Sequence, residues 1–171
     1  MYIHRIVELV NNFDVGPDKV RVGAVHFNSS AFLAFTLDQF TNKADVSSAI
    51  EAIPGPAGQT NLADAMRKTR TQLLVPPGDR TNATNACLMF TDGIATREKN
   101  ATEIEADLLK PLCTLITVSI GNDTDKSQLM RISSDNRFFE TPNFDFLKLI
   151  EANLTEIVCD VPEGKNFICQ R

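Results

Sequence analysis

The chain has 171 residues, enough for one domain with a sizeable core, and 43% of them are hydrophobic, as is usual in globular proteins. A formal net charge of -5, with no run of lysine and arginine in the sequence, argues against binding to nucleic acids or to anionic membranes. No apolar run approaches the roughly 18 residues of a transmembrane helix, and residues 1–13 lack the continuous hydrophobic region of a signal peptide.

The periodicity of the apolar residues predicts helices and strands that alternate along the chain. Apolar residues at helical spacing indicate a helix, and apolar, β-branched runs bounded by turn residues indicate a strand. In chain order, the expected elements are a helix over residues 1–13, strands over 20–27 and 31–37, helices over 45–53 and 61–74, a strand from 85 that ends at Asp92, a helix over 102–110, a strand over 112–120, a short helix from 125, a strand over 137–141 and a helix over 144–158.

Polar side chains predict how three of these helices begin. Asp45 is a candidate N-cap. Thr102 and Glu105 have the spacing of a capping box, and so have Asp125 and Gln128. Each of these side chains would bond to N–H groups of the first helical turn, which have no partner within the helix.

Strands that alternate with helices predict a mostly parallel sheet covered by helices on both faces, which is a doubly wound α/β domain. The strand over residues 31–37 would form its antiparallel edge. We expect the domain to occupy residues 1–159 and residues 160–171 to form a polar tail or linker.

Glycosylation sequons and cysteines favour an extracellular protein. Asn-X-Ser/Thr sequons are more frequent than the composition predicts, and these candidates are Asn28, Asn82, Asn100, Asn122 and Asn153. The four cysteines fit either an oxidising compartment or buried thiols. Cys87 and Cys113 lie in apolar, strand-like runs and are expected to be buried thiols, whereas Cys159 and Cys169, at and beyond the last helix, are disulfide candidates.

Motifs for catalysis and nucleotide binding are absent from the sequence. The glycine-rich residues 55–60 have neither the spacing nor the lysine of a phosphate-binding loop, and GxGxxG does not occur. His4 and His26 lie in a predicted amphipathic helix and a predicted buried strand, where they are poorly placed to activate a nucleophile. We therefore do not expect an enzyme.

Thr60 and Asp92 are the candidate metal ligands. Asp92 ends a predicted buried strand, and Thr60 stands at the entrance of the helix expected over residues 61–74. In a doubly wound domain both positions can lie at the edge where strands end, which is where ligands bind. Hydroxyl and carboxylate oxygens suit Mg²⁺. From position alone, a helix cap at Thr60 and a turn at Asp92 are the simpler explanations.

Four ordered stretches of the sequence resemble a von Willebrand factor type A (VWA) domain. They are residues 14–27 (DVGPDKVRVGAVHF), 58–66 (GQTNLADAM), 90–93 (FTDG) and 118–121 (VSIG). The resemblance covers about residues 1–159 and is to the members found in extracellular matrix proteins, such as collagen VI chains and matrilins.

The resemblance implies a secreted adhesive module. In the family, a metal-ion-dependent adhesion site holds Mg²⁺, or Mn²⁺ or Ca²⁺, and an acidic residue of the partner completes the coordination. Thr60 matches the threonine ligand of this site, and Asp92 matches its aspartate. The implied partner is collagen, or another matrix or adhesion protein.

The other ligands of the family site come from an Asp-X-Ser-X-Ser motif after the first strand, which is missing because Met1 already lies in what resembles the first helix. With two of the five site residues left, we expect weak or no Mg²⁺ binding by this chain. Without its first strand, the sheet should also expose an apolar trough and unpaired backbone groups. The hypothesis is that the sequence is a fragment, in which Cys159 has lost a disulfide partner upstream.

Two functions from different classes remain open. The first is an adhesive module that binds a matrix protein through this metal site. The alternative is a structural or assembly domain of a matrix protein with a degenerate, metal-free site. Mg²⁺ binding that depends on Asp92 would distinguish the first function from the second.

Overall fold

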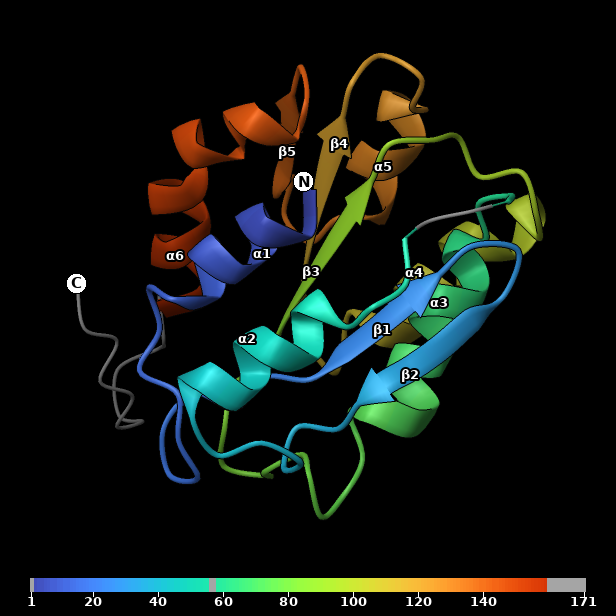
Figure 1. Ribbon diagram of the computed structural model, residues 1–171. Coiled ribbons are helices and arrows are strands. Elements are labelled where there is room, and N and C mark those ends of the chain that lie inside the picture. The colour runs from blue at the N-terminus through green and yellow to red at the C-terminus, as the bar shows by residue number, and fades with distance from the viewer. Residues whose placement is uncertain (1, 56–57, 160–171) are drawn as a thin grey trace.

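Strands and helices alternate along the chain in the computed structural model, which describes residues 2–55 and 58–159 (Figure 1). The helices are α1 (Tyr2–Val10), α2 (Lys43–Glu51), α3 (Leu62–Lys68), α4 (Lys99–Leu109), α5 (Lys126–Ile132) and α6 (Glu151–Cys159). The strands are β1 (Ala24–Phe27), β2 (Ala31–Phe35), β3 (Ala86–Thr91), β4 (Thr114–Ile120) and β5 (Phe138–Thr141). A π-helical segment (Thr69–Leu73) extends α3, and a 3-10 helix (Phe144–Leu149) precedes α6, so the predicted last helix is in two parts.

The strands form two sheets. β3, β4 and β5 are parallel neighbours, with Phe90 opposite Val118 and Val118 opposite Phe139. β1 and β2 form a separate antiparallel hairpin, in which His26 pairs with Phe32. The α/β class, the parallel sheet and an antiparallel pair predicted from the sequence are confirmed, but β2 lies in the separate hairpin and is not an edge of the parallel sheet.

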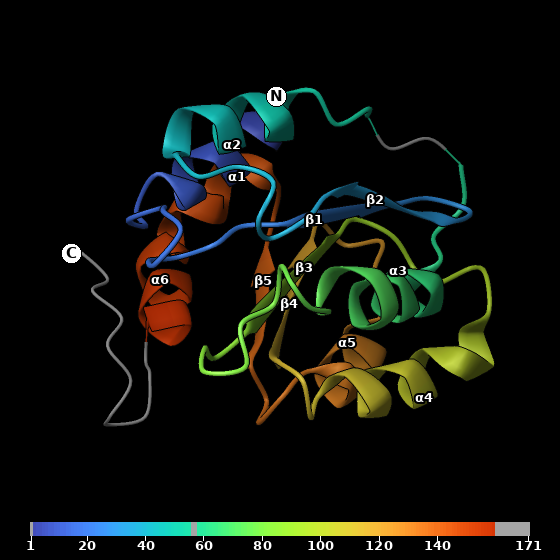
Figure 2. The same cartoon turned by 90° about the horizontal axis from the view of Figure 1, so that it is seen from below.

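Helices cover both faces of the parallel sheet, with α1, α2 and α6 on one face and α3, α4 and α5 on the other (Figure 2). The side chains of β4 alternate between two apolar cores. Ile116 and Val118 pack with the core that contains residues of α1 and α2, and Leu115 packs with the core of α3 and α4. Burial on both faces explains why this strand is apolar at successive positions.

An open groove separates the two sheets. Within residues 2–55 and 58–159, no backbone pairing joins β1 to β3, and a cavity of about 860 Å³ lies between these strands. Its lining includes the apolar side chains of Val25, Leu88 and Phe90. β3 therefore has a hydrogen-bonded neighbour on the β4 side, while N–H and C=O groups on its other side face the groove. An apolar trough with unpaired backbone groups beside it was predicted from the sequence, and this groove has both features.

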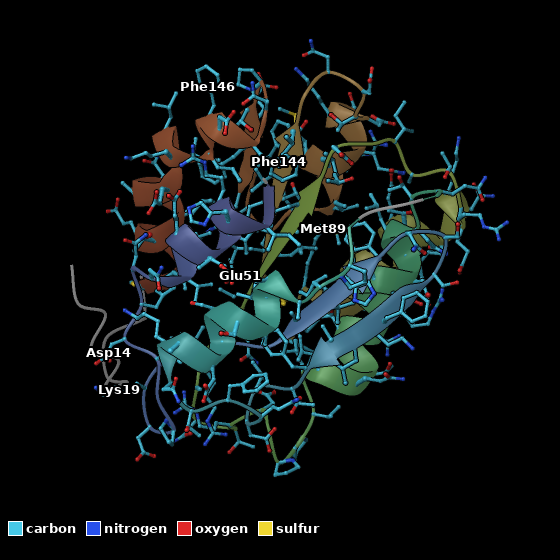
Figure 3. All side chains as sticks on the ribbon, in the orientation of Figure 1. Asp14, Lys19, Glu51, Met89, Phe144 and Phe146 are labelled. Atoms are coloured by element: carbon cyan, nitrogen blue, oxygen red, sulfur yellow. A yellow bond between two sulfur atoms is a disulfide. The ribbon has the colours of Figure 1, made fainter. Side chains whose placement is uncertain are left out.

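The turn after α1 is held by contacts close in sequence. The carboxylate of Asp14 pairs with the ammonium group of Lys19 at 2.6 Å (Figure 3), and Val15 and Val20 form an isolated parallel bridge. These contacts explain why α1 ends at Val10 and the chain reverses before β1.

The predicted strand over residues 20–27 is shorter in the described structure, because its pairing with β2 begins only at Ala24. Gly23 lies where the chain passes very close to other elements. A Cβ at this position would lie 2.5 Å from Leu73 Cδ1 and 3.2 Å from the Phe35 carbonyl oxygen. This close packing favours a glycine, which has no Cβ. The pairing of β1 with β2 begins at the next residue.

Two helix caps show how local prediction compares with the structure. α2 begins at Lys43, because Asn42 Oδ1 accepts a hydrogen bond from the Asp45 N–H (3.0 Å). The predicted cap at Asp45 is therefore wrong. The Asp45 carboxylate lies in the first turn, where its negative charge interacts favourably with the helix dipole. The predicted cap of α5 is confirmed, since Asp125 Oδ1 accepts from the Gln128 N–H (2.9 Å).

The capping box predicted for α4 is not formed. The helix begins at Lys99, after Glu98 in the left-handed conformation (φ 45°). Thr102 is fully buried and donates its hydroxyl to the Glu98 carbonyl (3.5 Å), one helical turn earlier. The Glu105 carboxylate pairs with Arg67 of α3 and with Arg70 of the segment that extends α3. Tertiary partners have replaced the local one at Glu105.

A disulfide joins Cys87 to Cys113, which corrects the prediction of two buried thiols. The bond connects β3 to the turn before its parallel neighbour β4, and the two Cα atoms are 6.0 Å apart, a usual spacing for a disulfide. Cys159 is also disulfide-bonded. The hypothesis that Cys159 has lost its disulfide partner is therefore wrong, and the other disulfide candidate, Cys169, lies outside the described residues.

No helix within residues 2–55 and 58–159 is long and apolar enough to cross a lipid bilayer.

Candidate ligand-binding site

Asp92 lies where β3 ends, and the fold does not use its carboxylate. The preceding residue, Thr91, is buried, and its hydroxyl donates to the Gly93 carbonyl (3.1 Å). Thr91 therefore holds the turn. The exposed Asp92 carboxylate has no hydrogen bond or ion pair with any described residue. A strand-ending turn does not by itself explain an aspartate here.

The hydroxyl of Thr60 is likewise free of a capping role. Asn61 caps α3, since its Oδ1 accepts from the Asp64 N–H (3.0 Å). The backbone of Thr60 is held by the loop after β3: its N–H donates to Thr96 Oγ1 (2.9 Å), and its carbonyl accepts from the N–H groups of Thr96 (2.9 Å) and Arg97 (3.2 Å). The Thr60 hydroxyl has no partner among the described residues.

The structure brings Thr60 and Asp92 to one place. A Cβ added to Gly93 would lie 3.0 Å from Thr60 Oγ1, so this hydroxyl lies against the residue that follows Asp92. Glycine at position 93 keeps the space in front of the hydroxyl open. The residues that carry this hydroxyl and this carboxylate thus lie near each other, at the entrance of α3 and the end of β3.

A cluster of charged residues fastens the loop after β3 to α3. We call it the Arg67 cluster, because Arg67 pairs with Glu98 (2.7 Å), Glu105 (2.9 Å) and Asp64 (3.1 Å). Glu98 also accepts a hydrogen bond from Asn61 Nδ2 (2.9 Å). The hydrogen bonds from Arg67 and then Asn61 lower the pKa of Glu98, and those to Glu98 and Glu105 raise the pKa of Arg67. Sequence patterns did not reveal this cluster, because its members come from segments far apart in the chain.

We expect acid to loosen the loop that the Arg67 cluster holds. The pKa of Glu98 in the folded state lies below its ordinary value of 4.5, so its contribution to stability is complete above pH 4.5 and is lost as the pH falls through the folded-state pKa. The stability of Glu98→Gln should therefore decline less between pH 7 and about pH 3 than that of the wild type, measured by urea unfolding.

The matched control for this test is Glu156→Gln, which makes the same charge change on an exposed position of α6. It should keep the pH dependence of the wild type. If Glu98→Gln and the wild type lose stability equally in acid, the ion pair with Arg67 has no role in holding the loop.

The loop between β1 and β2 reaches the same place. The carbonyl of Asn28 accepts from the Asn61 N–H (2.9 Å), and Ser29 Oγ accepts from the Gln59 N–H (3.3 Å). Three segments that are distant in sequence therefore form one surface. We call it the carboxyl edge: residues 28–30, 58–61 and 92–98.

The carboxyl edge offers two candidate oxygen ligands, Thr60 Oγ1 and the Asp92 carboxylate. Mg²⁺ prefers six oxygen ligands in near-octahedral geometry, some of which are usually water. Within residues 2–55 and 58–159, no group of three or more His, Cys, Asp or Glu side chains is arranged to hold a metal. Among the described residues, Thr60 and Asp92 therefore remain two candidate ligands.

The five sequons are spread over the surface. Asn82, Asn100, Asn122 and Asn153 are exposed and Asn28 is half-buried. Asn28 and Asn122 lie just after the carboxyl ends of β1 and β4. Asn82 lies before the start of β3, at the opposite end of the sheet.

The chain matches a known protein family. Residues 2–153 match the family model described as von Willebrand factor type A domain, so the chain belongs to the VWA family. The resemblance drawn from the sequence is confirmed. VWA domains of collagen chains are non-enzymatic binding modules.

Its relatives include extracellular matrix collagens. The chain is 30% identical over 157 residues to the collagen alpha-6(VI) chain of Mus musculus, covering 90% of this chain and 7% of the relative. It is 26% identical to the collagen alpha-1(XX) chain of Homo sapiens, covering 93% of this chain and 12% of the relative. The chain thus spans a small part of the length of these proteins.

A solved structure of a matrix protein has the same fold. Proximal thread matrix protein 1 from the mussel byssus superposes with a TM-score of 0.83 at 27% identity, covering 92% of this chain and 40% of that one. A second structure of the same protein, with a zinc-occupied metal-ion-dependent adhesion site, also has a TM-score of 0.83 at 27% identity and covers 92% of this chain and 39% of that one.

Proposed function

We propose that the chain is an extracellular module that binds a matrix protein, with collagen as the first candidate, through a metal-ion-dependent adhesion site at the carboxyl edge. One observation carries the proposal: the unpartnered Thr60 hydroxyl lies against Gly93, next to an Asp92 carboxylate that the fold does not use. The collagen relatives and the zinc-occupied site of the byssus protein support it. The module comprises residues 1–159, and residues 160–171 form its tail.

In this site, Thr60 and Asp92 would hold Mg²⁺, or Mn²⁺ or Ca²⁺, whose charge attracts an acidic side chain of the partner. Thr60 is pinned through its backbone, so its hydroxyl is oriented before any ligand binds. Two protein ligands are too few for tight binding of Mg²⁺. We therefore expect this chain by itself to bind Mg²⁺ weakly or not at all.

The test combines Mg²⁺ calorimetry with binding to immobilised collagen, in Mg²⁺ and in EDTA. Both measurements use this chain and, where the gene encodes further residues, the full-length product. We expect collagen binding that EDTA abolishes, which this chain by itself shows only at high Mg²⁺ concentration and a longer product shows at lower concentration if upstream residues add ligands. Collagen binding that is equal in Mg²⁺ and EDTA would contradict a metal-dependent site.

A structural or assembly domain with a metal-free site is the second candidate. It is favoured by the groove between β1 and β3, where the free side of β3 presents backbone groups able to pair with another strand. Association that persists in EDTA and is unchanged by loss of Asp92 would support this function over adhesion.

We expect Gly93→Ala to weaken ligand binding, because the new methyl group would lie 3.0 Å from Thr60 Oγ1 and displace the hydroxyl. Overpacking of this size costs about 1 kcal/mol, or roughly fivefold in affinity. Collagen binding in Mg²⁺ is the measurement. Gly16→Ala is the matched control, since its Cβ meets a flexible Lys19 side chain at 3.3 Å. Equal binding by the two variants would show that the Thr60 hydroxyl makes no contact with the ligand or its cation.

A further inference from the structure

The side chain of Asn28 is oriented so that its amide nitrogen is available. Asn28 Oδ1 accepts from the Ser30 N–H (3.2 Å), and the Asn28 N–H donates to the Ser30 carbonyl (3.0 Å). The amide nitrogen, Nδ2, has no partner among the described residues. It is also absent from the buried polar atoms that lack a partner, which are His26 Nδ1, Arg70 Nε and Thr141 Oγ1. Asn28 Nδ2 is therefore not fully buried among the described residues.

Asn28 is the first residue of a sequon, Asn28-Ser29-Ser30, and Nδ2 is the atom to which an N-glycan is attached. Ser30 is exposed, and both of its described hydrogen bonds use backbone groups. The disulfide between Cys87 and Cys113 fits the secretory pathway in which N-glycans are added.

The place of Asn28 makes this sequon different from a remote surface site. The Asn28 carbonyl is bonded to the backbone of Asn61, and Ser29 is bonded to the backbone of Gln59, so the two residues flank Thr60. A bulky, hydrophilic glycan on Asn28 would rise from the carboxyl edge itself. Asn82, by contrast, lies at the far end of the sheet.

We propose that Asn28 carries an N-glycan that covers the carboxyl edge, so that glycosylation of this residue controls the access of a matrix protein to Thr60 and Asp92. The proposal rests on the proposed function of this edge. A glycosylated molecule would be a poor ligand binder, and a molecule that escaped glycosylation at Asn28 would be the competent form.

The test uses the chain secreted from animal cells behind an added signal peptide. Peptide mass mapping after treatment with peptide N-glycosidase measures occupancy at Asn28. Binding to immobilised collagen in Mg²⁺ is then compared for the untreated protein, the deglycosylated protein and Ser30→Ala, which deletes the sequon but keeps its backbone bonds. Thr84→Ala deletes the Asn82 sequon and is the matched control.

We expect Asn28 to be occupied, and both deglycosylation and Ser30→Ala to raise collagen binding several-fold, while Thr84→Ala leaves it unchanged. An unmodified Asn28 overturns the proposal. So does an occupied Asn28 whose glycan can be removed without any gain in binding.

A second measurement keeps the inference separate from the proposed function. The rate at which a large maleimide reagent labels Gln59→Cys reports access to the carboxyl edge without any ligand, and Ala52→Cys, at the exposed end of α2, is the control. Removal of the glycan should speed labelling at position 59 alone. If no form binds collagen, collagen binding as the proposed function fails, and this labelling rate still decides whether the glycan covers the edge.

Discussion

Asp92→Ala is expected to abolish metal-dependent binding to collagen and to leave the fold intact. Asp92 supplies the carboxylate of the candidate site, and loss of a charged group from a binding contact costs about 2–5 kcal/mol, or roughly 30-fold or more in Kd. Its carboxylate has no partner among the described residues, so the free energy of unfolding should change by less than about 0.5 kcal/mol. Surface plasmon resonance in Mg²⁺ and urea unfolding measure the two quantities.

Asp123→Ala is the matched control for Asp92→Ala. Asp123 is an exposed aspartate in the loop after β4, and it has no hydrogen bond or ion pair with the described residues. The Asp123→Ala variant should bind collagen as the wild type does. Equal losses in the two variants would indicate general electrostatic attraction, and unchanged binding by Asp92→Ala would favour the assembly function.

Removing the disulfide between Cys87 and Cys113 should have the largest effect on stability. The bond closes a loop with a sequence separation of 26 residues, which corresponds to roughly 3.5 kcal/mol of stabilisation through the entropy of the unfolded chain. We expect the double variant Cys87→Ala/Cys113→Ala to lose about this free energy of unfolding in urea.

The single variants provide the control for this loss. Each of Cys87→Ala and Cys113→Ala breaks the same bond, so each should lose nearly as much as the double variant. If the two cysteines were independent buried thiols, the losses would be smaller and would add. Additive losses would therefore contradict the disulfide.

The architecture could be predicted from the sequence because burial on both faces leaves a strong pattern. β4 is apolar at successive positions, and the amphipathic helices between the strands repeat their apolar residues at helical spacing. The boundaries were less accurate. Asn42 and Asp45 are similar as caps, and the tertiary partners of Glu105 could not be seen from local spacing.

The disulfide and the Arg67 cluster were missed for the same physical reason. The apolar surroundings of Cys87 and Cys113 describe each residue separately, whereas the bond depends on the register of two neighbouring strands. Arg67 and Glu98 likewise meet only after α3 and the loop following β3 pack together. Thr60 and Asp92 could be singled out because their motifs place each of them at the end of an element, and their role as metal ligands stays a prediction.

The groove between β1 and β3 also determines how ligand binding and folding are linked. The backbone of Thr60 is bonded to the loop after β3, and its neighbours Gln59 and Asn61 are bonded to the loop that follows β1. Asp92 comes directly after β3, and no sheet pairing joins β1 to β3 in the described chain. Loop hydrogen bonds and helix packing, and not a continuous sheet, therefore set the separation of the two groups. A ligand that contacts both acts as a crosslink between the entrance of α3 and the end of β3, so it should raise the melting temperature in proportion to the logarithm of its concentration above Kd.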